Sequence, residues 1–456
     1  MAKVLIFGSG GRDHCLADKY AGSQHVDKVY FMPGNPGVMF TPKGKKGLIQ
    51  RVPLADSNDF QKVVDFCIEN DVNLVDIGSE NPLSRGLADV LNFNAIPTIG
   101  PTQAFSILES DRAFTNFLLT GSGVPKPEYR VFADAGQAQA YVKNIGYQVV
   151  VKANGLAAGK GAFVCDDADD ALKAIELLMI KKKFGASGDR IVIEQRKYGA
   201  EISFFTYLDG RHIMPLKMLC QDYKPAFDTE DYDSIEKFKG NLNTGGTGCC
   251  CPHKLMNDTL VNRIIKEIIN PTVNTIYNSY GWNYKGVLYF GLNLDPDNNL
   301  EVFEINVRHG DPECEVLLRK LSTDLFELGM AVWEGALDKI TPVWNKQHYV
   351  DVIAMEGRSK ASRGWNQGYP KRYGKNHAIQ GLDKIDHDIA IYFAGVDTHA
   401  ERGLVTYGGR VLHIVAGAKT PEEARQKAYR NIARISFKDH KQKDADCIRY
   451  RQTIGL

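Results

Sequence analysis

Short apolar runs alternate with glycine turns and helical stretches through the first hundred residues. Residues 3–7 form a strand-like run, which enters the turn G-S-G-G-R-D-H at 8–14 and then a helix ending at Tyr20. Residues 28–31 and 73–77 are two further apolar runs. Strand, glycine turn and helix in this order are typical of a doubly wound α/β unit. We predict an N-terminal α/β domain at 1–103, because P-T-I-G-P-T at 97–102 punctuates the chain.

The central part of the chain predicts a larger unit at 104–325. Residues 104–119 indicate one helix with Arg112 near its middle, and residues 125–192 indicate a small lid of strands with a helix at 170–181. Strands are expected at 191–194 and 204–208, and a strand pair at 287–294 and 301–305 is joined by the turn D-P-D-N-N. The segment 225–242 shows no clear periodicity, so we expect a surface excursion.

The last part of the chain, 326–456, again predicts α/β structure. A helix at 325–335 leads into strands at 350–355, 389–393 and 411–416 and a helix at 421–432. T-Y-G-G-R at 406–410 indicates a hairpin turn. Residues 357–377 are basic, aromatic and glycine-rich, and we expect a loop because no companion basic stripe indicates nucleic-acid binding.

Composition limits the class of protein and its partners. With 456 residues, 43% hydrophobic and 24% charged, the chain can build about three domains with sizeable cores. A net charge of +1 gives no bulk attraction to nucleic acid or membrane, so neither is an expected partner. No signal peptide or bilayer-spanning apolar run is visible. The nine cysteines show no paired C-x-x-C spacing, so neither zinc nor disulfides are indicated, and a cytoplasmic location is expected.

Residues 150–161, V-V-K-A-N-G-L-A-A-G-K-G, are a candidate nucleotide clamp. Lys152 ends an apolar strand and Lys160 lies in the following loop, so both could supply positive charge to a polyphosphate. The loop glycines allow backbone N–H groups to approach an anion closely. The stretch is not G-x-x-x-x-G-K-[ST], because no hydroxyl follows Lys160 to hold a metal. The metal ligands must therefore lie elsewhere.

E-I-N at 304–306 is the candidate metal site. Residues two apart on a strand share a face, so Glu304 and Asn306 would present two oxygen ligands side by side. Hard oxygen donors beside nucleotide phosphates suit Mg²⁺ (or Mn²⁺). Arg308 falls on the same face and could reach the γ-phosphate. A bare E-x-N is more often a solvated strand end, and only its companions favour the metal.

Arg12, Asn35 and Glu80 each follow the end of a predicted N-terminal strand, and they are candidate substrate ligands. Ligands in open α/β sheets bind beyond the carboxyl ends of the strands. A dinucleotide site would need an acidic residue after the second strand, and M-P-G-N-P-G at 32–37 has none. The glycine turn itself is equally consistent with a purely structural tight turn.

The chain resembles the glycinamide ribonucleotide synthetase family of the ATP-grasp superfamily nearly end to end. The motifs that carry the resemblance are G-S-G-G-R-D-H at 8–14, P-G-N at 33–35, G-S-E-N-P-L at 78–83, I-G-P-T at 99–102, K-A-N-G-L-A-A-G-K-G at 152–161, N-T-G-G at 243–246, E-I-N-V-R-H-G-D-P-E at 304–313, T-Y-G-G-R-V-L at 406–412 and R-Q-T-I-G at 451–455.

The resemblance implies an N-terminal substrate-binding domain, an ATP-grasp domain with a lid, a C-terminal domain and a monomer. It implies that ATP, glycine and 5-phosphoribosylamine give glycinamide ribonucleotide, ADP and phosphate in purine biosynthesis, by way of glycyl phosphate. By the same resemblance, Arg112 and Lys152 would contact ATP phosphates, Glu194 the adenine and Glu201 the ribose; Glu304 and Asn306 would bind Mg²⁺, and Arg308 would stabilise the transferred phosphoryl group. The substrates would lie against Gly10, Gly11, Arg12, Asn243, Thr244, Gly245, Gly246 and Asp311.

The sequence departs from the family pattern mainly around the expected acceptor site. Arg112 replaces a lysine, Asn154 an aspartate, Tyr223 a histidine and Thr453 an aspartate, while 241–242 and 247–249 differ and the segment at 225–242 is longer. Three hypotheses stay open: the family reaction, a diverged ligase with a changed acid or amine, and a non-catalytic ATP-binding protein. Retention of Lys152, Glu304, Asn306 and Arg308 argues against the third. The chain ends almost directly after I-G, so no fused domain is expected.

Overall fold

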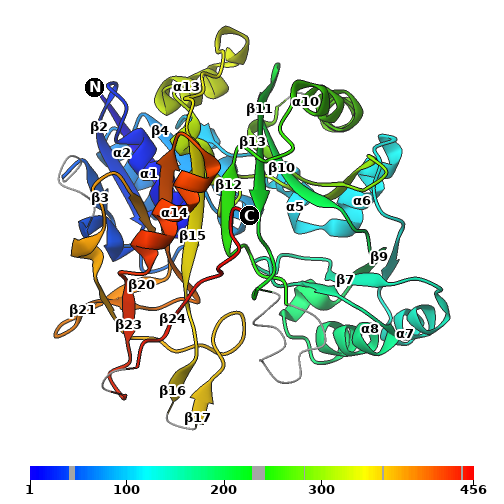
Figure 1. The fold of residues 1–456 in the computed structure, drawn as a ribbon. Helices are drawn as coiled ribbons and strands as arrows, with labels where there is room; N and C mark the ends of the chain where they lie inside the picture. The colour runs from blue at the N-terminus through cyan, green and yellow to red at the C-terminus, as the bar shows by residue number, and fades with distance from the viewer. Residues whose placement is uncertain (41–46, 229–241, 282, 362–363, 443–444) are drawn as a thin grey trace.

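A computed structural model describes residues 1–40, 47–228, 242–281, 283–361, 364–442 and 445–456. The N-terminal part is a five-stranded parallel sheet in the order β3-β2-β1-β4-β5 (Figure 1). The apolar run predicted at 3–7 is the central strand, because Val4 to Phe7 are buried between the helices on both faces. The elements are β1 Ala2–Gly8, α1 Gly11–Tyr20, β2 Val26–Pro33, η1 Pro36–Phe40, β3 Ile49–Arg51, α2 Phe60–Glu69, β4 Leu74–Ile77, α3 Glu80–Ser84, α4 Leu87–Phe93 and β5 Thr98–Ile99.

Two short helices follow, where the sequence predicts one. The prediction of a continuous helix at 104–119 is wrong, since Asp111 has extended backbone angles (φ −135°, ψ 97°) between α5 Gln103–Ser110 and α6 Arg112–Gly121. The Asp111 carboxylate accepts a hydrogen bond from Phe114 N at 2.9 Å and so caps α6. Arg112 therefore begins a helix instead of lying in the middle of one.

The predicted lid is a separate antiparallel sheet in the order β6-β9-β7-β8 with its own apolar core. Helices α7 and α8 lie together on one side of it (Figure 1); α7 is not among the predicted elements. The bounds are β6 Tyr129–Phe132, α7 Ala135–Asn144, β7 Val149–Ala153, β8 Ala162–Val164, α8 Ala168–Ile175, the π-turn η3 Glu176–Ile180, η4 Gly185–Gly188 and β9 Ile191–Gln195.

A nine-stranded sheet forms the centre of the molecule, in the order β14-β13-β10-β11-β12-β15-β22-β19, with β24 paired to β15. The sheet takes strands from both sides of residue 325. The domain boundaries predicted at 103 and 325 stay predictions. Its strands are β10 Ala200–Asp209, β11 Ile213–Asp222, β12 Gly248–Cys251, β13 Lys285–Leu294, β14 Leu300–Asn306, β15 His348–Glu356, β19 Ala390–Phe393, β22 Arg410–Ala418 and β24 Ile448–Arg449; the helices around it are α10 Asp258–Ile264, η5 Ile265–Ile269, α11 Asn270–Tyr280, α12 Glu313–Lys320, α13 Leu325–Glu334, η6 Leu337–Lys339 and α14 Pro421–Ile432.

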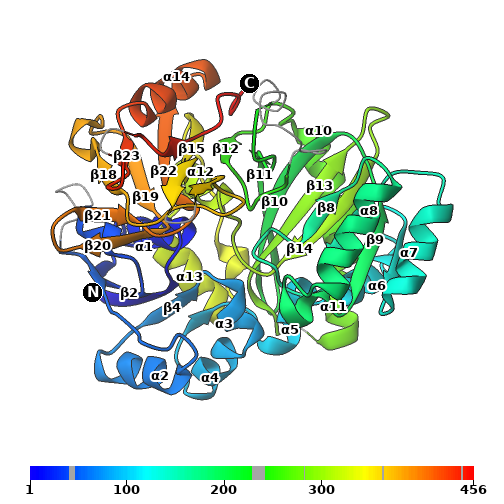
Figure 2. The same cartoon turned by 90° about the horizontal axis from the view of Figure 1, so that it is seen from below.

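A four-stranded sheet, β20-β21-β18-β23, completes the C-terminal part and lies beside the N-terminal sheet, opposite the lid (Figure 2). The hairpin predicted at 406–410 is wrong, since β21 pairs with β18 and β20 whereas β22 pairs with β15 and β19; the turn crosses between two sheets. Residues 357–377 also contain a two-stranded hairpin besides the predicted loop. The elements are β16 Ser359–Ala361, β17 Gly364–Asn366, β18 Ala378–Gln380, η7 Leu382–Lys384, β20 Val396–His399, β21 Gly403–Thr406 and β23 Ser436–Lys438.

Two further predictions concern the segment 225–242 and membrane-spanning helices. Most of the excursion predicted at 225–242 lies at 229–241, outside the described residues. Within the described part of the chain, no helix combines the length and the apolar character needed to cross a bilayer.

Candidate active site

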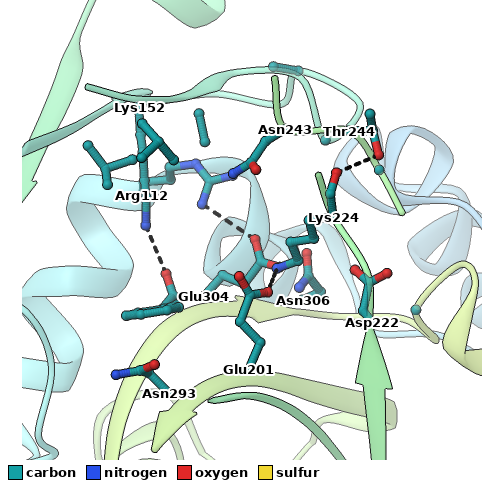
Figure 3. A pocket seen from close by; sticks show the side chains of 18 of the residues that line it. Arg112, Lys152, Glu201, Asp222, Lys224, Asn243, Thr244, Asn293, Glu304 and Asn306 are labelled. Carbon is teal, nitrogen blue, oxygen red and sulfur yellow. Dashed lines mark hydrogen bonds and ion pairs between the residues drawn. The ribbon is translucent and has the colours of Figure 1, made fainter. Parts of the chain in front are cut away.

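A cavity of about 650 Å³ lies where the N-terminal sheet, the lid and the nine-stranded sheet meet. Arg12 and Glu80 reach it from the carboxyl ends of β1 and β4, as the position of ligands in open α/β sheets predicts. Lys152 reaches it from the lid, and Glu304 from β14. Most of the predicted site residues therefore line one cavity (Figure 3).

Lys152 is held by neighbouring lid strands and by the central sheet. It lies on β7, and its Nζ is 2.5 Å from Oε2 of Glu194 on the adjacent strand β9. The same ammonium donates to the carbonyl of Phe303 at 3.2 Å. Both charged side chains are nearly buried, and Glu201 of β10 lines the cavity beyond them. The arrangement fixes a cation at the back of the cavity.

The glycine loop after Lys152 closes one wall by packing against the N-T-G-G loop at 243–246. Gly159 has φ of 71°, and a Cβ there would lie 2.8 Å from the Cα of Gly245. Only glycine fits this approach, because an L side chain would be both strained and blocked. Lys160 does not line the cavity: its Nζ lies 5.2 Å above the ring of Tyr369. The structure therefore does not bring the second lysine of the loop to the site.

Glu304 and Asn306 project from β14 into the cavity, as their two-residue spacing predicts (Figure 3). The Glu304 carboxylate is 3.0 Å from Lys224 Nζ and 3.9 Å from Arg112 Nη1. Burial alone would raise the pKa of Glu304, but Lys224, Arg112 and then Lys152 outweigh it and hold this pKa well below its usual value. An ionised carboxylate beside an amide oxygen is a donor set that fits a hard divalent cation.

Arg308 is clamped between two carboxylates. Its Nη2 lies 2.7 Å from Glu109 and its Nε 3.4 Å from Glu80, while Nη2 also donates to Asn306 Oδ1 at 3.3 Å. Glu80 lies 3.6 Å from Arg12 as well. Burial would raise the pKa of Glu80, but Arg308 and Arg12 outweigh it and lower this pKa. The clamp orients the guanidinium toward the cavity.

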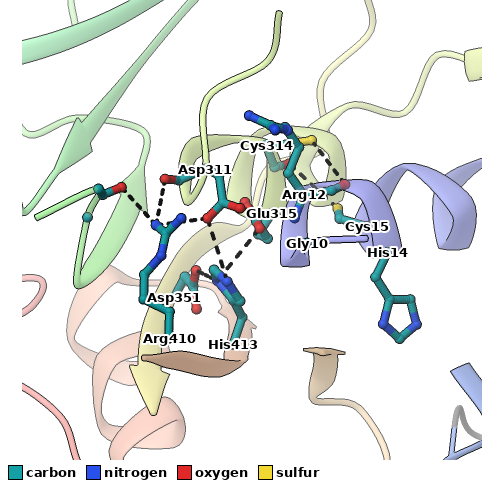
Figure 4. A network of polar contacts seen from close by, with 12 residues as sticks. Gly10, Arg12, His14, Cys15, Asp311, Cys314, Glu315, Asp351, Arg410 and His413 are labelled. Atoms are coloured by element: carbon teal, nitrogen blue, oxygen red, sulfur yellow. Dashed lines mark hydrogen bonds and ion pairs between the residues drawn. The ribbon is translucent and has the colours of Figure 1, made fainter. Parts of the chain in front are cut away.

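A buried polar network continues from the cavity toward β22 (Figure 4). Arg410 Nη1 lies 3.0 Å from Asp311 and donates to the Gly245 carbonyl at 2.8 Å. Against the effect of burial, Arg410 and His413 lower the pKa of Asp311 to about 2. His413 is held by a 2.7 Å contact between its Nδ1 and Asp351. Asp311 is thereby fixed as a carboxylate at the cavity wall.

The comparisons with known proteins agree with this architecture along the whole chain. Three family models match: the N domain of phosphoribosylglycinamide synthetase at residues 2–109, its ATP-grasp (A) domain at 110–314 and its C domain at 365–455. The chain belongs to the phosphoribosylglycinamide synthetase family. Its central domain is thus an ATP-grasp domain, which binds ATP.

Relatives of the family cover the chain from end to end. A phosphoribosylamine–glycine ligase of Archaeoglobus fulgidus is 35% identical over 480 residues, covering 100% of this chain and 99% of the relative. One of Allochromatium vinosum is 37% identical over 438 residues, covering 96% of each. The crystal structure of a phosphoribosylamine–glycine ligase from Thermotoga maritima superposes with a TM-score of 0.76 at 26% identity, covering 99% of both chains.

Several residues predicted to bind substrate lie behind the cavity wall. Asn35 is buried, and its Nδ2 donates to the carbonyls of Ser9 (2.9 Å) and Phe393 (2.8 Å), so it joins the N- and C-terminal parts. Gly10, Gly11 and Gly246 also lie outside the cavity lining, whereas Arg12, Asn243, Thr244, Gly245 and Asp311 belong to it.

The departures from the family pattern at Tyr223 and 247–251 do not reach the cavity. The Tyr223 hydroxyl accepts a hydrogen bond from Gly455 N at 3.1 Å, and Cys249 and Cys251 are buried in the core. None of them lines the cavity. A changed substrate therefore has no support from these positions.

Sequence reasoning missed four residues that shape the site. Lys224 follows β11. The sequence does not predict this strand because Pro215 and Lys217 interrupt its apolar pattern, and Lys217 also has a positive φ of 49°. Glu109 is indistinguishable from any other acidic residue near a helix end. Arg410 and His413 lie on β22, and only the sheet order brings Arg410 to the cavity and His413 behind Asp311 in its wall. The spacing of charged residues carries no signal for such contacts.

Proposed function

We propose that this chain is an ATP-dependent phosphoribosylamine–glycine ligase, with ATP, glycine and 5-phosphoribosylamine as substrates. The observation that supports it most is the convergence of three parts on one cavity: the lid lysine Lys152, the pair Glu304 and Asn306, and Arg12 with Glu80 from the N-terminal sheet. A nucleotide, an acid and an amine must meet in one place for this reaction. Its family and the names of its full-length relatives point to the same activity.

The reaction needs an activated carboxylate. The glycine carboxylate attacks the γ-phosphorus of ATP, forming glycyl phosphate and releasing ADP. The amine of phosphoribosylamine then attacks the carbonyl carbon, a C–N bond forms, the C–O bond to phosphate breaks, and the amine loses a proton. Phosphoryl transfer of this kind relies mainly on positioning and charge neutralisation.

Each group of side chains takes a role that matches its charge. Arg112 and Lys152 would neutralise ATP phosphates, while Glu194 and Glu201 would accept hydrogen bonds from the adenine and the ribose. Glu304 and Asn306 would hold Mg²⁺ (or Mn²⁺), which when bound supplies further positive charge to the phosphates. Arg308, clamped by Glu109 and Glu80, would face the transferred phosphoryl group. Arg12, the Asn243–Gly245 loop and Asp311 would position the two other substrates.

A phosphate-release assay with ATP and Mg²⁺ tests the proposal. Release that needs both glycine and phosphoribosylamine is expected, and omission of either should stop it. Turnover only with another acid or amine would replace the proposed substrates, and tight ATP binding without turnover would indicate a non-catalytic protein. Gel filtration and cell fractionation would test the monomer and the cytoplasmic location that we also propose.

Glu304→Gln tests the metal assignment separately. Loss of the carboxylate should lower kcat by about 10²–10³-fold or more, as the removal of one charge-stabilising group does. Glu301→Gln on the same strand is the matched control, since Glu301 pairs with Lys197 at 3.0 Å and does not line the cavity. Near-normal turnover in Glu304→Gln would remove this residue from the metal site.

A further inference from the structure

Four polar side chains from distant parts of the chain meet in the interior of the C-terminal part, outside the cavity lining. Glu356 ends β15, His377 precedes β18, Asp439 follows β23 and Cys447 precedes β24. None of them is more than 2% exposed. Burial of two carboxylates, an imidazole and a thiol together is costly unless each finds a compensating partner.

The two ring nitrogens of His377 face different carboxylates. Its Nδ1 lies 3.0 Å from both carboxylate oxygens of Glu356, which accept the Nδ1 proton. The other ring nitrogen, Nε2, faces Asp439 Oδ1 at 3.8 Å, too far for a hydrogen bond. A carboxylate that orients the far nitrogen of a histidine is the usual companion of a histidine that ligates a metal.

We propose that His377 Nε2, an Asp439 carboxylate oxygen and Cys447 Sγ bind a zinc ion, with Glu356 as the positioning residue behind His377. One ligand atom from each of the three residues lies within 4.8 Å of the others, and Nε2 is 3.8 Å from Asp439 Oδ1. Imidazole nitrogen, thiolate sulfur and carboxylate oxygen are the ligand types of zinc, and a tetrahedral ion would take water as its fourth ligand.

The charges of the cluster favour a divalent cation. Glu356 and Asp439 face a single imidazole, so an ion would balance a local excess of negative charge. Zinc takes cysteine as the thiolate, so binding would release the thiol proton of Cys447.

The backbone supports the ligands and packs against the imidazole. Asp439 is fixed by hydrogen bonds from Lys441 N to Oδ1 (2.8 Å) and Lys360 N to Oδ2 (3.2 Å). Gly374 packs closely against the imidazole, because a Cβ there would lie 2.4 Å from His377 Cε1 and 2.5 Å from Ser359 Oγ, so only glycine fits. This packing holds the ring in place.

The site would connect two sheets. Cys447 directly precedes β24 of the nine-stranded sheet, whereas His377 and Asp439 flank β18 and β23 of the four-stranded sheet. An ion held between them would act on the stability of the C-terminal part and not on ligase chemistry. The sequence gives no hint of it, because the ligands are 62 and 8 positions apart and form no recognised motif.

Cobalt substitution of the full chain tests the proposal. Protein stripped with a chelator and loaded with Co²⁺ should show tetrahedral d–d bands and a thiolate-to-cobalt charge-transfer band. The band excludes the cavity, whose described lining includes no cysteine, but Cys220, Cys249 and Cys251 also lie together, so the Cys447 variant below assigns it. Zn²⁺ should abolish the band, bind at one equivalent per chain and raise the Tm of the stripped protein.

Three variants sharpen the test. Cys447→Ser should lose the charge-transfer band, whereas Cys165→Ser, which removes an equally buried thiol in the lid core, should keep it. Glu356→Gln should keep the band but weaken zinc affinity about 10–100-fold. Stripped wild-type protein that neither takes up Co²⁺ or Zn²⁺ nor gains Tm would overturn the proposal without any substitution, as would a band that persists in Cys447→Ser.

Discussion

Gly11→Ala is a sharp test of the contact between the N-terminal helix α1 and the C-terminal strand β22. A Cβ at Gly11 would lie 2.5 Å from His413 Cδ2 and 3.0 Å from Glu315 Oε1. His413 is fully buried and held by Asp351, so it has little freedom to retreat. Carbon contacts need at least 3.5 Å, and the ring would have to move by about 1 Å.

The expected cost follows from this displacement. Overpacking of a core side chain costs about 1–3 kcal/mol. Weakening the hydrogen bond between His413 and Asp351 leaves a buried carboxylate poorly satisfied, at about 1–3 kcal/mol. The intrinsic preference of a helix for alanine over glycine returns up to about 1 kcal/mol. The free energy of unfolding should therefore fall by about 1–6 kcal/mol.

Urea unfolding of four proteins measures the effect: wild type, Gly11→Ala, His413→Ala and the double variant. Removal of the ring restores space for the Cβ, so the second substitution should cancel much of the first, with a coupling of about 0.5–3 kcal/mol. Gly121→Ala is the matched control, because Gly121 also lies in a helix and a Cβ there meets nothing within 4 Å. Strictly additive free energies, or equal costs at both glycines, would refute the packing argument.

Two further predictions concern the clamp on Arg308 and the C-terminal segment. Glu109→Ala should lower kcat far more than Glu109→Gln, because glutamine keeps an acceptor for Arg308; equal rates in a steady-state assay would contradict this role. Burial alone would raise the pKa of Asp228, but hydrogen bonds, led by the one from Thr453, outweigh it and lower this pKa. The stabilisation that Asp228 contributes is therefore present above the pKa of the unfolded state. It is lost as the pH falls through the pKa of the folded state. The difference in unfolding free energy between wild type and Asp228→Asn should shrink on acidification, and a constant difference across that range would contradict it.

Local patterns explain most of what the sequence could predict. After the register shift at Phe303, residues 304–306 pair regularly with β13, and the two-residue repeat of a strand places Glu304 and Asn306 on one face. β1 and β4 pair in parallel, so their carboxyl ends meet at one edge of the sheet, and Arg12 and Glu80 follow these ends. These residues reach the cavity through rules that act within a few positions.

Long-range pairing explains most of what the sequence could not predict. The two strands on either side of the 406–410 turn belong to different sheets, and that choice depends on the partners β18 and β15. Arg410 reaches the cavity, and His413 reaches Asp311 behind it, only through this pairing. The apolar periodicity of 104–119 favours one continuous helix, but Asp111 breaks it. Its carboxylate caps α6, and aspartate is more favourable at an N-cap than inside a helix.

The glycines of the N-terminal turn show how one residue type can serve two physical purposes. A phosphate-binding turn and a tightly packed turn both require glycine, so the sequence alone leaves the choice open. In the fold, a Cβ at Gly8 would lie 2.5 Å from Asp13 Oδ1, and one at Gly11 would overlap His413, so packing already excludes side chains there. At Gly10 the nearest atoms, Asp13 Oδ2 and Asp311 Oδ2, are 3.4 and 3.5 Å away, which is ordinary contact. Packing therefore explains why positions 8 and 11 require glycine. It does not explain Gly10, so a requirement for glycine at that position would have to come from a bound anion.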